Sequence, residues 1–165
     1  MSSWEAPGKT DEWMTPRYVF DALGVEFDLD VAAPVYGAPH VPSKKWFHRD
    51  ALEREWGGFV WMNPPYGGRN ALMPWVEKFL QHGNGLALVP DRTSAPWFAP
   101  LFDRSDAIMF VYSKIKFERP DGSLGMSPGN GTALAAVGQR GVQALLRAHG
   151  VLGSAVRPIG GLFHG

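Results

Sequence analysis

The chain has 165 residues and no cysteine, and its sixteen basic residues balance sixteen acidic ones, so the formal net charge is zero. The absence of cysteine excludes disulfides and thiolate chemistry, and the zero net charge gives the chain no bulk attraction for polyanions. Hydrophobic residues make up 45% of the chain, which is typical of a globular domain with its own core.

The first elements follow from local signals. Residues 1–11 are polar, and we expect a loose arm there, followed by a single domain over residues 12–165. Thr15 and Pro16 are typical of an N-cap and a first-turn proline, and Gly24 is placed to end the helix that they begin. The alternation of apolar and acidic residues over 25–31 predicts a strand, and the prolines of 34–42 predict a loop.

The rest of the chain alternates between segments with helical periodicity and segments with the pattern of strands. Further helices are predicted at residues 50–56, 70–82, 95–102 and 142–149, and further strands at 59–62, 85–89, 107–112, 115–117 and 132–137. This order indicates an α/β fold with a mainly parallel sheet and helices on both faces. The strands at 107–112 and 115–117 are too close for a helical crossover, so we expect an antiparallel hairpin at the edge of the sheet.

One segment carries a pattern that indicates chemistry, and it follows the strand at 59–62. There the chain continues Asn63-Pro64-Pro65-Tyr66. Two prolines fix the backbone and remove two N–H donors, which leaves carbonyl oxygens to accept hydrogen bonds beside the Asn63 amide. These acceptors suit a planar amine such as that of adenine, and a tyrosine ring offers a face on which a base can stack.

Asn63-Pro64-Pro65-Tyr66 resembles the motif of S-adenosylmethionine-dependent amino-methyltransferases, and a wider set of segments resembles the phage-type DNA N6-adenine methyltransferases. The matching segments span about residues 11–137 and occur in the family's order. They are residues 11–16 (DEWMTP), 27–33 (FDLDVAA), 61–67 (WMNPPYG), 75–78 (WVEK), 89–93 (VPDRT) and 97–98 (WF). The resemblance implies a compact Rossmann-like class I methyltransferase fold, a flipped adenine as substrate, and double-stranded DNA as partner.

The resemblance also implies roles for the motif residues. The Asn63 side chain and the Pro64 carbonyl accept hydrogen bonds from the adenine N6 amine, Pro65 keeps the backbone fixed, and Tyr66 stacks on the base. Catalysis then consists of positioning and electrostatics.

The residues implied to bind S-adenosylmethionine are less distinctive, because the first strand is not followed by a glycine-rich loop. They are Thr15, Pro16, Asp30, Ala32, Asp50 and Asn63. Each acid has an ordinary alternative: Asp28 and Asp30 as solvent-facing residues on one face of a strand, and Asp50 as the N-cap of a helix with Glu53 at its third position. For Thr15 the alternative is the helix cap described above.

DNA contacts are expected from basic residues outside the motif. The candidates are Lys44, Lys45, Arg69, Arg92 and Thr93, although Arg92 is equally suited to an ion pair with a neighbouring acid. The chain has no room for a separate target-recognition domain, so we expect loops 34–49, 91–98 and 118–131 to supply specificity, the last of them as a mobile element. The charge is unevenly distributed along the chain, so DNA affinity is expected to be modest, salt-dependent and confined to one face.

Several alternatives remain open at this stage. The same motif serves enzymes that methylate RNA adenine, cytosine N4 or protein glutamine, and a non-catalytic DNA-binding relative would keep the fold without the activity. The five histidines show no metal-binding spacing, so no metal is expected. No run of residues has the length of a membrane span or the pattern of a signal peptide. A cytoplasmic protein of a bacterial host, encoded by a phage or prophage, is therefore expected.

Overall fold

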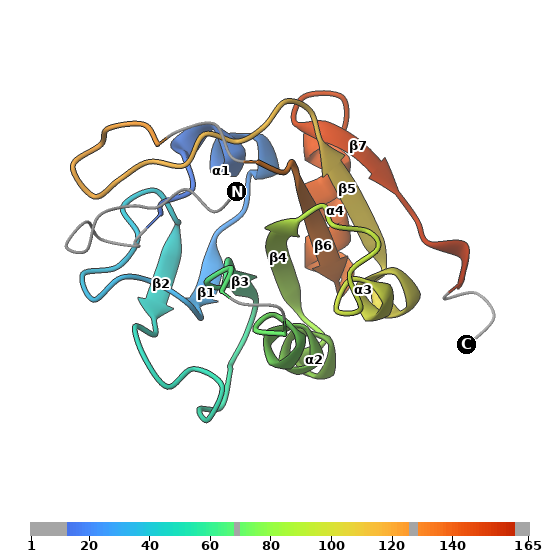
Figure 1. Cartoon of the computed structure of the whole chain (residues 1–165), viewed down its shortest axis with the longest axis horizontal. Coiled ribbons are helices and arrows are strands. Elements are labelled where there is room, and N and C mark those ends of the chain that lie inside the picture. Colours follow the sequence, from blue (N-terminus) through green and yellow to red (C-terminus); the bar gives the residue numbers. More distant parts are fainter. Residues whose placement is uncertain (1–12, 68–69, 126–128, 161–165) are drawn as a thin grey trace.

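The computed structural model describes residues 13–67, 70–125 and 129–160, which form a seven-stranded sheet with helices packed on it (Figure 1). The strands are β1 (Phe27–Asp30), β2 (Ser43–Trp46), β3 (Val60–Met62), β4 (Gly85–Pro90), β5 (Ala107–Val111), β6 (Thr132–Val137) and β7 (Gly153–Val156). The helices are α1 (Arg17–Leu23), α2 (Met73–His82), α3 (Ala99–Arg104) and α4 (Gln139–Ala148).

The sheet is mixed, with the strand order β2-β1-β3-β4-β6-β5-β7. The pairs β2–β1, β1–β3 and β3–β4 are parallel, whereas β4–β6, β6–β5 and β5–β7 are antiparallel and hold the larger number of paired residues. The expectation of a mainly parallel sheet with one antiparallel edge hairpin was therefore wrong in extent. The reason is that β6 returns between β4 and β5, and β7 then adds to the outer side of β5.

Other differences arise where short-range patterns competed with tertiary pairing. Residues 115–117 form no strand, and residues 51–54 form turns instead of the helix expected at 50–56. The strands β2 and β7 were not predicted, because β2 is a polar edge strand and β7 carries little apolar pattern. The expected arm at 1–11 lies outside the described residues.

Two apolar clusters fill the space on either side of the sheet. On one face, Val19, Phe20 and Leu23 of α1 and Leu145 of α4 pack against Trp61 and its neighbours. On the other face, α2 and α3 cover Val60 and Met62 of β3 and the β4 residues on the same face, Ala87 and Val89. Helices thus lie on both faces (Figure 1), and the helix ends at Gly24 and Gly83 adopt the left-handed conformation that glycine permits.

This topology gathers loops from distant parts of the chain. Because β1, β2, β3 and β4 run parallel, their carboxyl ends share one edge of the sheet. Asp30, residues 47–50, residues 63–66 and residues 91–93 all occur at that edge. Since β6 runs in the opposite direction beside β4, its start at Thr132 lies there as well.

Candidate functional site

The motif segment leaves β3 at the shared edge, and its side chains form a small hydrogen-bonded network. The Asn63 amide nitrogen donates to Thr15 Oγ1 at 3.1 Å, and the Tyr66 hydroxyl donates to Asn63 Oδ1 at 3.0 Å. The same hydroxyl lies 3.2 Å from the carbonyl oxygen of Leu88 on β4. Within the part of the chain that the structure describes, no donor contacts the carbonyl of Pro64, although Pro64 itself is buried.

Tyr66 combines a held hydroxyl with an accessible ring. Its side chain remains 42% exposed, and the edge of the ring meets Phe117 with the ring centroids 6.5 Å apart and the planes at 84°. Burial of the hydroxyl raises the pKa of Tyr66 above its ordinary value, so the group keeps its proton at neutral pH. It therefore acts as a hydrogen-bond donor while the ring stays available to a planar ligand.

Thr15 reaches the network from the segment before α1. Its side chain is only 2% exposed, and the N-cap of α1 is Pro16, with no side chain bonded to the helix end. The helix-cap role suggested for Thr15 was therefore wrong. Its hydroxyl bonds to Asn63 instead, and Pro16 is buried beside it.

A tether holds this N-terminal segment in place. Met14 exchanges two backbone hydrogen bonds with Glu118, at 2.8 and 2.9 Å, and the Glu118 carboxylate contacts His40 Nε2 at 2.8 Å. Segments from three distant parts of the chain are thus joined beside Asn63. Residues 117–125 form a hairpin-like turn, in which Gly125 donates to Phe117 and Arg119 donates to Ser123.

The structure places Asp30 at the end of β1, directly beside Trp61 of β3. It is 2% exposed, and its carboxylate accepts a 3.1 Å hydrogen bond from the backbone N–H of Ala32. Burial raises the pKa of Asp30 to about 7, and no cation among the described residues opposes that effect. The solvent-facing alternative for Asp30 was therefore wrong.

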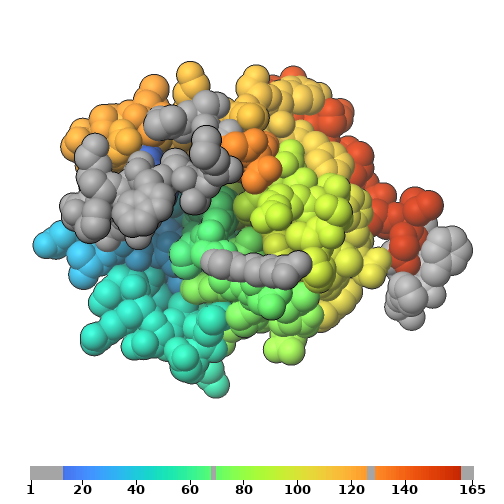
Figure 2. All heavy atoms as spheres, in the orientation of Figure 1, coloured from blue at the N-terminus to red at the C-terminus, as the bar shows by residue number. Residues whose placement is uncertain are grey.

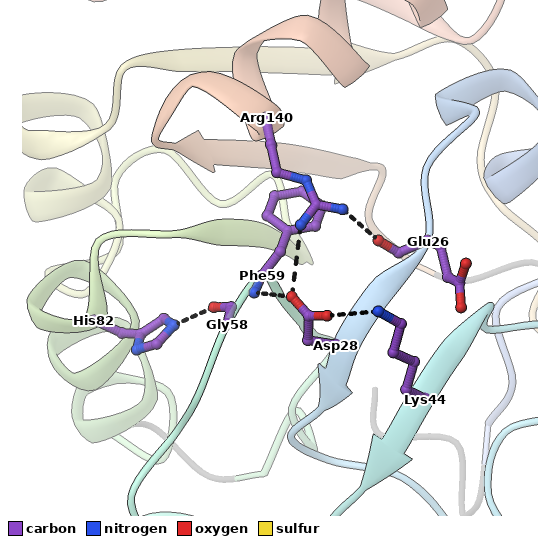
Figure 3. A network of polar contacts seen from close by, with 7 residues as sticks. All are labelled: Glu26, Asp28, Lys44, Gly58, Phe59, His82 and Arg140. Carbon is purple, nitrogen blue, oxygen red and sulfur yellow. Dashed lines mark hydrogen bonds and ion pairs between the residues drawn. The ribbon is translucent and has the colours of Figure 1, made fainter.

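The carboxylate of Asp28, on the same strand, contacts a backbone N–H and two basic side chains (Figure 3). Its carboxylate accepts from the Phe59 N–H at 2.8 Å and contacts Lys44 at 3.3 Å and Arg140 of α4 at 3.5 Å. The Phe59 hydrogen bond, then Lys44 and Arg140, lower the pKa of Asp28. Gly58 is required beside it, because a Cβ there would lie 2.5 Å from the Asp28 carboxylate.

Asp50 also follows a parallel strand, but its carboxylate is exposed, and the one ion pair that it makes with a described residue is with Arg49, at 3.9 Å. Its backbone has a φ of +56°, and its carbonyl accepts from the Glu53 N–H in a turn. No helix follows, so the N-cap interpretation of Asp50 was wrong. Ala32, by contrast, is half-buried and supplies the N–H that binds Asp30.

The basic candidates are not gathered into one cluster. Lys44 is paired with Asp28, and Lys45 lies on the opposite face of the edge strand β2 by strand alternation. Arg92 and Thr93 are exposed in the loop after β4, and no acid in the described ranges pairs with Arg92. Arg69 lies outside the described residues.

The loop after β4 is joined to the start of β6. The Asp91 N–H donates to the Gly131 carbonyl at 3.1 Å, and a Cβ at Gly131 would lie 2.5 Å from the Asp91 carboxylate. In Figure 2 the orange surface of the loop before β6 borders the yellow-green surface of the residues that follow β4. Two of the loops expected to supply specificity are therefore neighbours on one face.

Two searches of the described residues are negative. No group of three histidine, aspartate or glutamate side chains is arranged to hold a metal ion within residues 13–67, 70–125 and 129–160. Over the same ranges, no helix has the length and apolar character needed to cross a membrane.

Sequence reasoning missed the contacts that join distant segments. The Thr15–Asn63 bond spans 48 residues and the His40–Glu118 contact spans 78, so no local spacing indicates them. The burial of Asp30 without a cation among the described residues likewise depends on the tertiary fold.

Comparison with known proteins identifies the family of the chain. The model of the family described as DNA N-6-adenine-methyltransferase (Dam) matches residues 3–143, which include α1, the motif segment and the start of α4. No curated protein and no solved structure matches the chain. The family match covers most of the chain, and the chain therefore belongs to the DNA N-6-adenine-methyltransferase family.

Proposed function

We propose that this protein transfers a methyl group from S-adenosylmethionine to the N6 amine of adenine in double-stranded DNA. The observation that carries the proposal is the presentation of Asn63. Its amide is held by Thr15 and Tyr66 directly after a central parallel strand, beside a proline whose carbonyl has no described partner. In a sheet of this topology, ligands bind at the carboxyl ends of the strands.

Asn63 and Pro64 supply two acceptors for one amine. An exocyclic N6 amine has two N–H donors, and the Asn63 Oδ1 and the Pro64 carbonyl oxygen can each accept one. Accepting both bonds draws the nitrogen lone pair out of conjugation with the ring and directs it away from the two oxygens. Fixed acceptors act without reorganisation during the reaction, which is the main source of catalysis by positioning.

Tyr66 provides the surface for the base. The ring is exposed, is supported at its edge by Phe117, and is fixed at its hydroxyl by Asn63 and Leu88. A base extruded from the duplex and stacked on an aromatic side chain regains about 1–3 kcal/mol, which offsets part of its unstacking.

Asp30 fits the positively charged cofactor. A buried carboxylate without a cation is costly, and a ligand that brings a positive charge removes that cost. The small residues Ala32 and Ala33 next to it leave room for close approach. S-adenosylmethionine supplies the methyl group as an activated sulfonium. Within this proposal Pro16, Ala32 and Asp50 complete the residues that hold it, while Thr15 and Asn63 face the substrate amine.

The fold supports the same proposal. Four parallel strands carry the candidate site residues at their carboxyl ends, with the motif segment after β3, and β6 lies antiparallel next to β4. We include in the proposal that this sheet corresponds to the Rossmann-like class I methyltransferase arrangement, with DNA lying across the edge that carries Arg92, Thr93 and Lys45.

The test is a transfer assay with labelled S-adenosylmethionine and unmethylated DNA, RNA or protein as acceptor, followed by digestion and identification of the labelled product. We expect N6-methyladenine from DNA. Label in RNA, in cytosine N4 or in glutamine would assign a different acceptor, and cofactor binding without transfer to any of them would contradict the proposal.

A variant pair makes the assay specific for the site. Asn63→Ala is expected to reduce transfer by at least about 100-fold, the effect of losing an electrostatic contact to the reacting group, while cofactor binding is largely kept. Asn70→Ala is the matched control, because Asn70 is exposed in the turn before α2. Equal rates for the two variants would remove Asn63 from the reaction.

A further inference from the structure

We propose that Thr15 is a positioning residue whose hydroxyl holds the Asn63 amide by its nitrogen, which keeps the amide oxygen available to the substrate. The proposal rests on the proposed function, because it concerns how Asn63 receives an amine. It assigns to Thr15 an action on the catalytic side chain, separate from any contact with the cofactor.

The orientation of the amide decides whether Asn63 can work. A carboxamide has an accepting oxygen and a donating nitrogen at nearly equal positions, and only the oxygen can accept from an amine. In the structure the nitrogen donates to Thr15 Oγ1 at 3.1 Å, which turns Oδ1 the other way, toward Tyr66. Thr15 is 2% exposed, so water has little access to replace its hydroxyl.

Tyr66 alone does not fix this orientation. Its hydroxyl has one proton and lies near two acceptors, Asn63 Oδ1 at 3.0 Å and the Leu88 carbonyl at 3.2 Å. The bond from the Asn63 nitrogen to Thr15 Oγ1 is the second side-chain contact that the described residues give this amide. Without it, the amide would be held only by a hydroxyl that can donate to Leu88 instead.

The surrounding chain holds Thr15 for this role. The two backbone bonds between Met14 and Glu118 fix the residue before it, and Pro16 restricts the backbone of Thr15 itself. The hydroxyl does not cap α1, whose start has no side-chain bond. The bond to Asn63 is thus the hydrogen bond that the Thr15 side chain makes among the described residues.

The experiment compares Thr15→Val, Thr15→Ser and a matched control, Thr132→Val. Thr132 is equally buried, at 2% exposed, and its hydroxyl has no hydrogen-bond partner among the described residues, so valine there removes a hydroxyl without removing a described hydrogen bond. We expect kcat for DNA methylation to fall about 100-fold in Thr15→Val, the effect of a misplaced reacting group, with the KM for S-adenosylmethionine changed by less than about threefold. Thr15→Ser restores kcat, and Thr132→Val matches the parent protein.

A spectroscopic measurement reports on the surroundings of the Asn63 side-chain amide and does not require catalysis. The chain has asparagine only at positions 63, 70, 84 and 130, so selective ¹⁵N-asparagine labelling yields four pairs of side-chain NH₂ signals, and Asn63→Ala identifies one pair. Thr15→Val is expected to shift the Asn63 signal and leave the other three in place. Thr132→Val is expected to shift none of them by a comparable amount.

The outcomes separate this proposal from the proposed function. A Thr15→Val protein with normal kcat and an unmoved Asn63 signal overturns the positioning role. So does a variant whose only defect is a raised KM for S-adenosylmethionine, since that defect indicates a cofactor contact. If the parent protein transfers no methyl group, the proposed function fails, and the amide signal still reports whether Thr15 orients Asn63.

Discussion

Asp28 and Asp30 lie two residues apart on β1, and their surroundings are opposite. Asp28 is partly exposed, accepts a backbone hydrogen bond and contacts two cations, Lys44 and Arg140 (Figure 3). Asp30 is buried with one backbone N–H and no described cation. The comparison separates a carboxylate that stabilises the fold from one that the fold holds at an energetic disadvantage, which is typical of a binding group.

The two pKa shifts predict opposite effects on stability. The folded pKa of Asp30, about 7, lies above the ordinary value of 3.8, so its contribution favours folding at low pH and is lost as the pH rises from about 4 to 7. The folded pKa of Asp28 lies below its ordinary value of 3.8. Its contribution is therefore present above that value and is lost as the pH falls through the folded pKa.

The largest predicted effect is on the ligand-free protein. Asp30→Asn removes a buried charge, so the free energy of unfolding at pH 8 should rise by up to about 4 kcal/mol, and the gain should largely vanish near pH 4. Urea unfolding at the two pH values measures it. A loss of stability at pH 8 would show that the carboxylate has a stabilising partner.

The next effect is on cofactor binding. Asp30→Asn should weaken S-adenosylmethionine binding about 100-fold, because the ligand loses an opposite charge in a poorly hydrated site. Asp28→Asn is the matched control on the same strand, and its affinity should stay within about threefold of the parent value. Isothermal titration calorimetry measures the affinity of both variants for S-adenosylmethionine. An equal loss of affinity in the two variants would contradict the distinction between the two acids.

The pH dependence of binding sharpens the comparison further. If the cofactor requires the ionised Asp30, whose pKa is about 7, its affinity should rise about fivefold from pH 6 to pH 7 and level off above about pH 8. Asp28→Asn should keep this profile, whereas Asp30→Asn should flatten it. A profile unchanged by Asp30→Asn would assign the titration to another group.

The smallest effect concerns the partners of Asp28. Lys44→Met removes one exposed ion pair and should lower the free energy of unfolding by less than about 1 kcal/mol. Asp28→Asn should cost about 1–2 kcal/mol, because the hydrogen bond from Phe59 is weakened as well. Urea unfolding in low and high salt measures the two losses of stability. A larger loss for Lys44→Met than for Asp28→Asn would contradict this prediction.

The sequence predicted the parts of the fold that depend on local pattern. The helix ending at Gly24, the strand before Asn63, the helix ending at Gly83 and the strand at 132–137 are confirmed. The edge strand β2 was missed because SKKW has no apolar alternation, and its pairing with β1 comes from the tertiary fold. The turns at 51–54 and the antiparallel return of β6 also depend on neighbours distant in sequence.

The site was predictable to a similar degree. The motif residues and Asp30 were predicted from the sequence as site residues, and the structure places them at the same edge of the sheet. The family match supports the family-level chemistry. What each side chain touches was not predictable, as Thr15 and Lys44 show: one bonds to Asn63 and the other pairs with Asp28. Both contacts join strands and loops that local spacing does not relate.

The two backbone hydrogen bonds between Met14 and Glu118 have a consequence for the stage of folding at which the candidate site forms. The groups around Asn63 come from residues 15, 63, 66 and 88, and Glu118 closes the arrangement from farther along the chain. Contacts of such long range form late in folding, because loop closure must precede them. A partly folded chain therefore lacks the bond between Thr15 and Asn63, and this group of side chains is complete only when both halves of the polypeptide have come together.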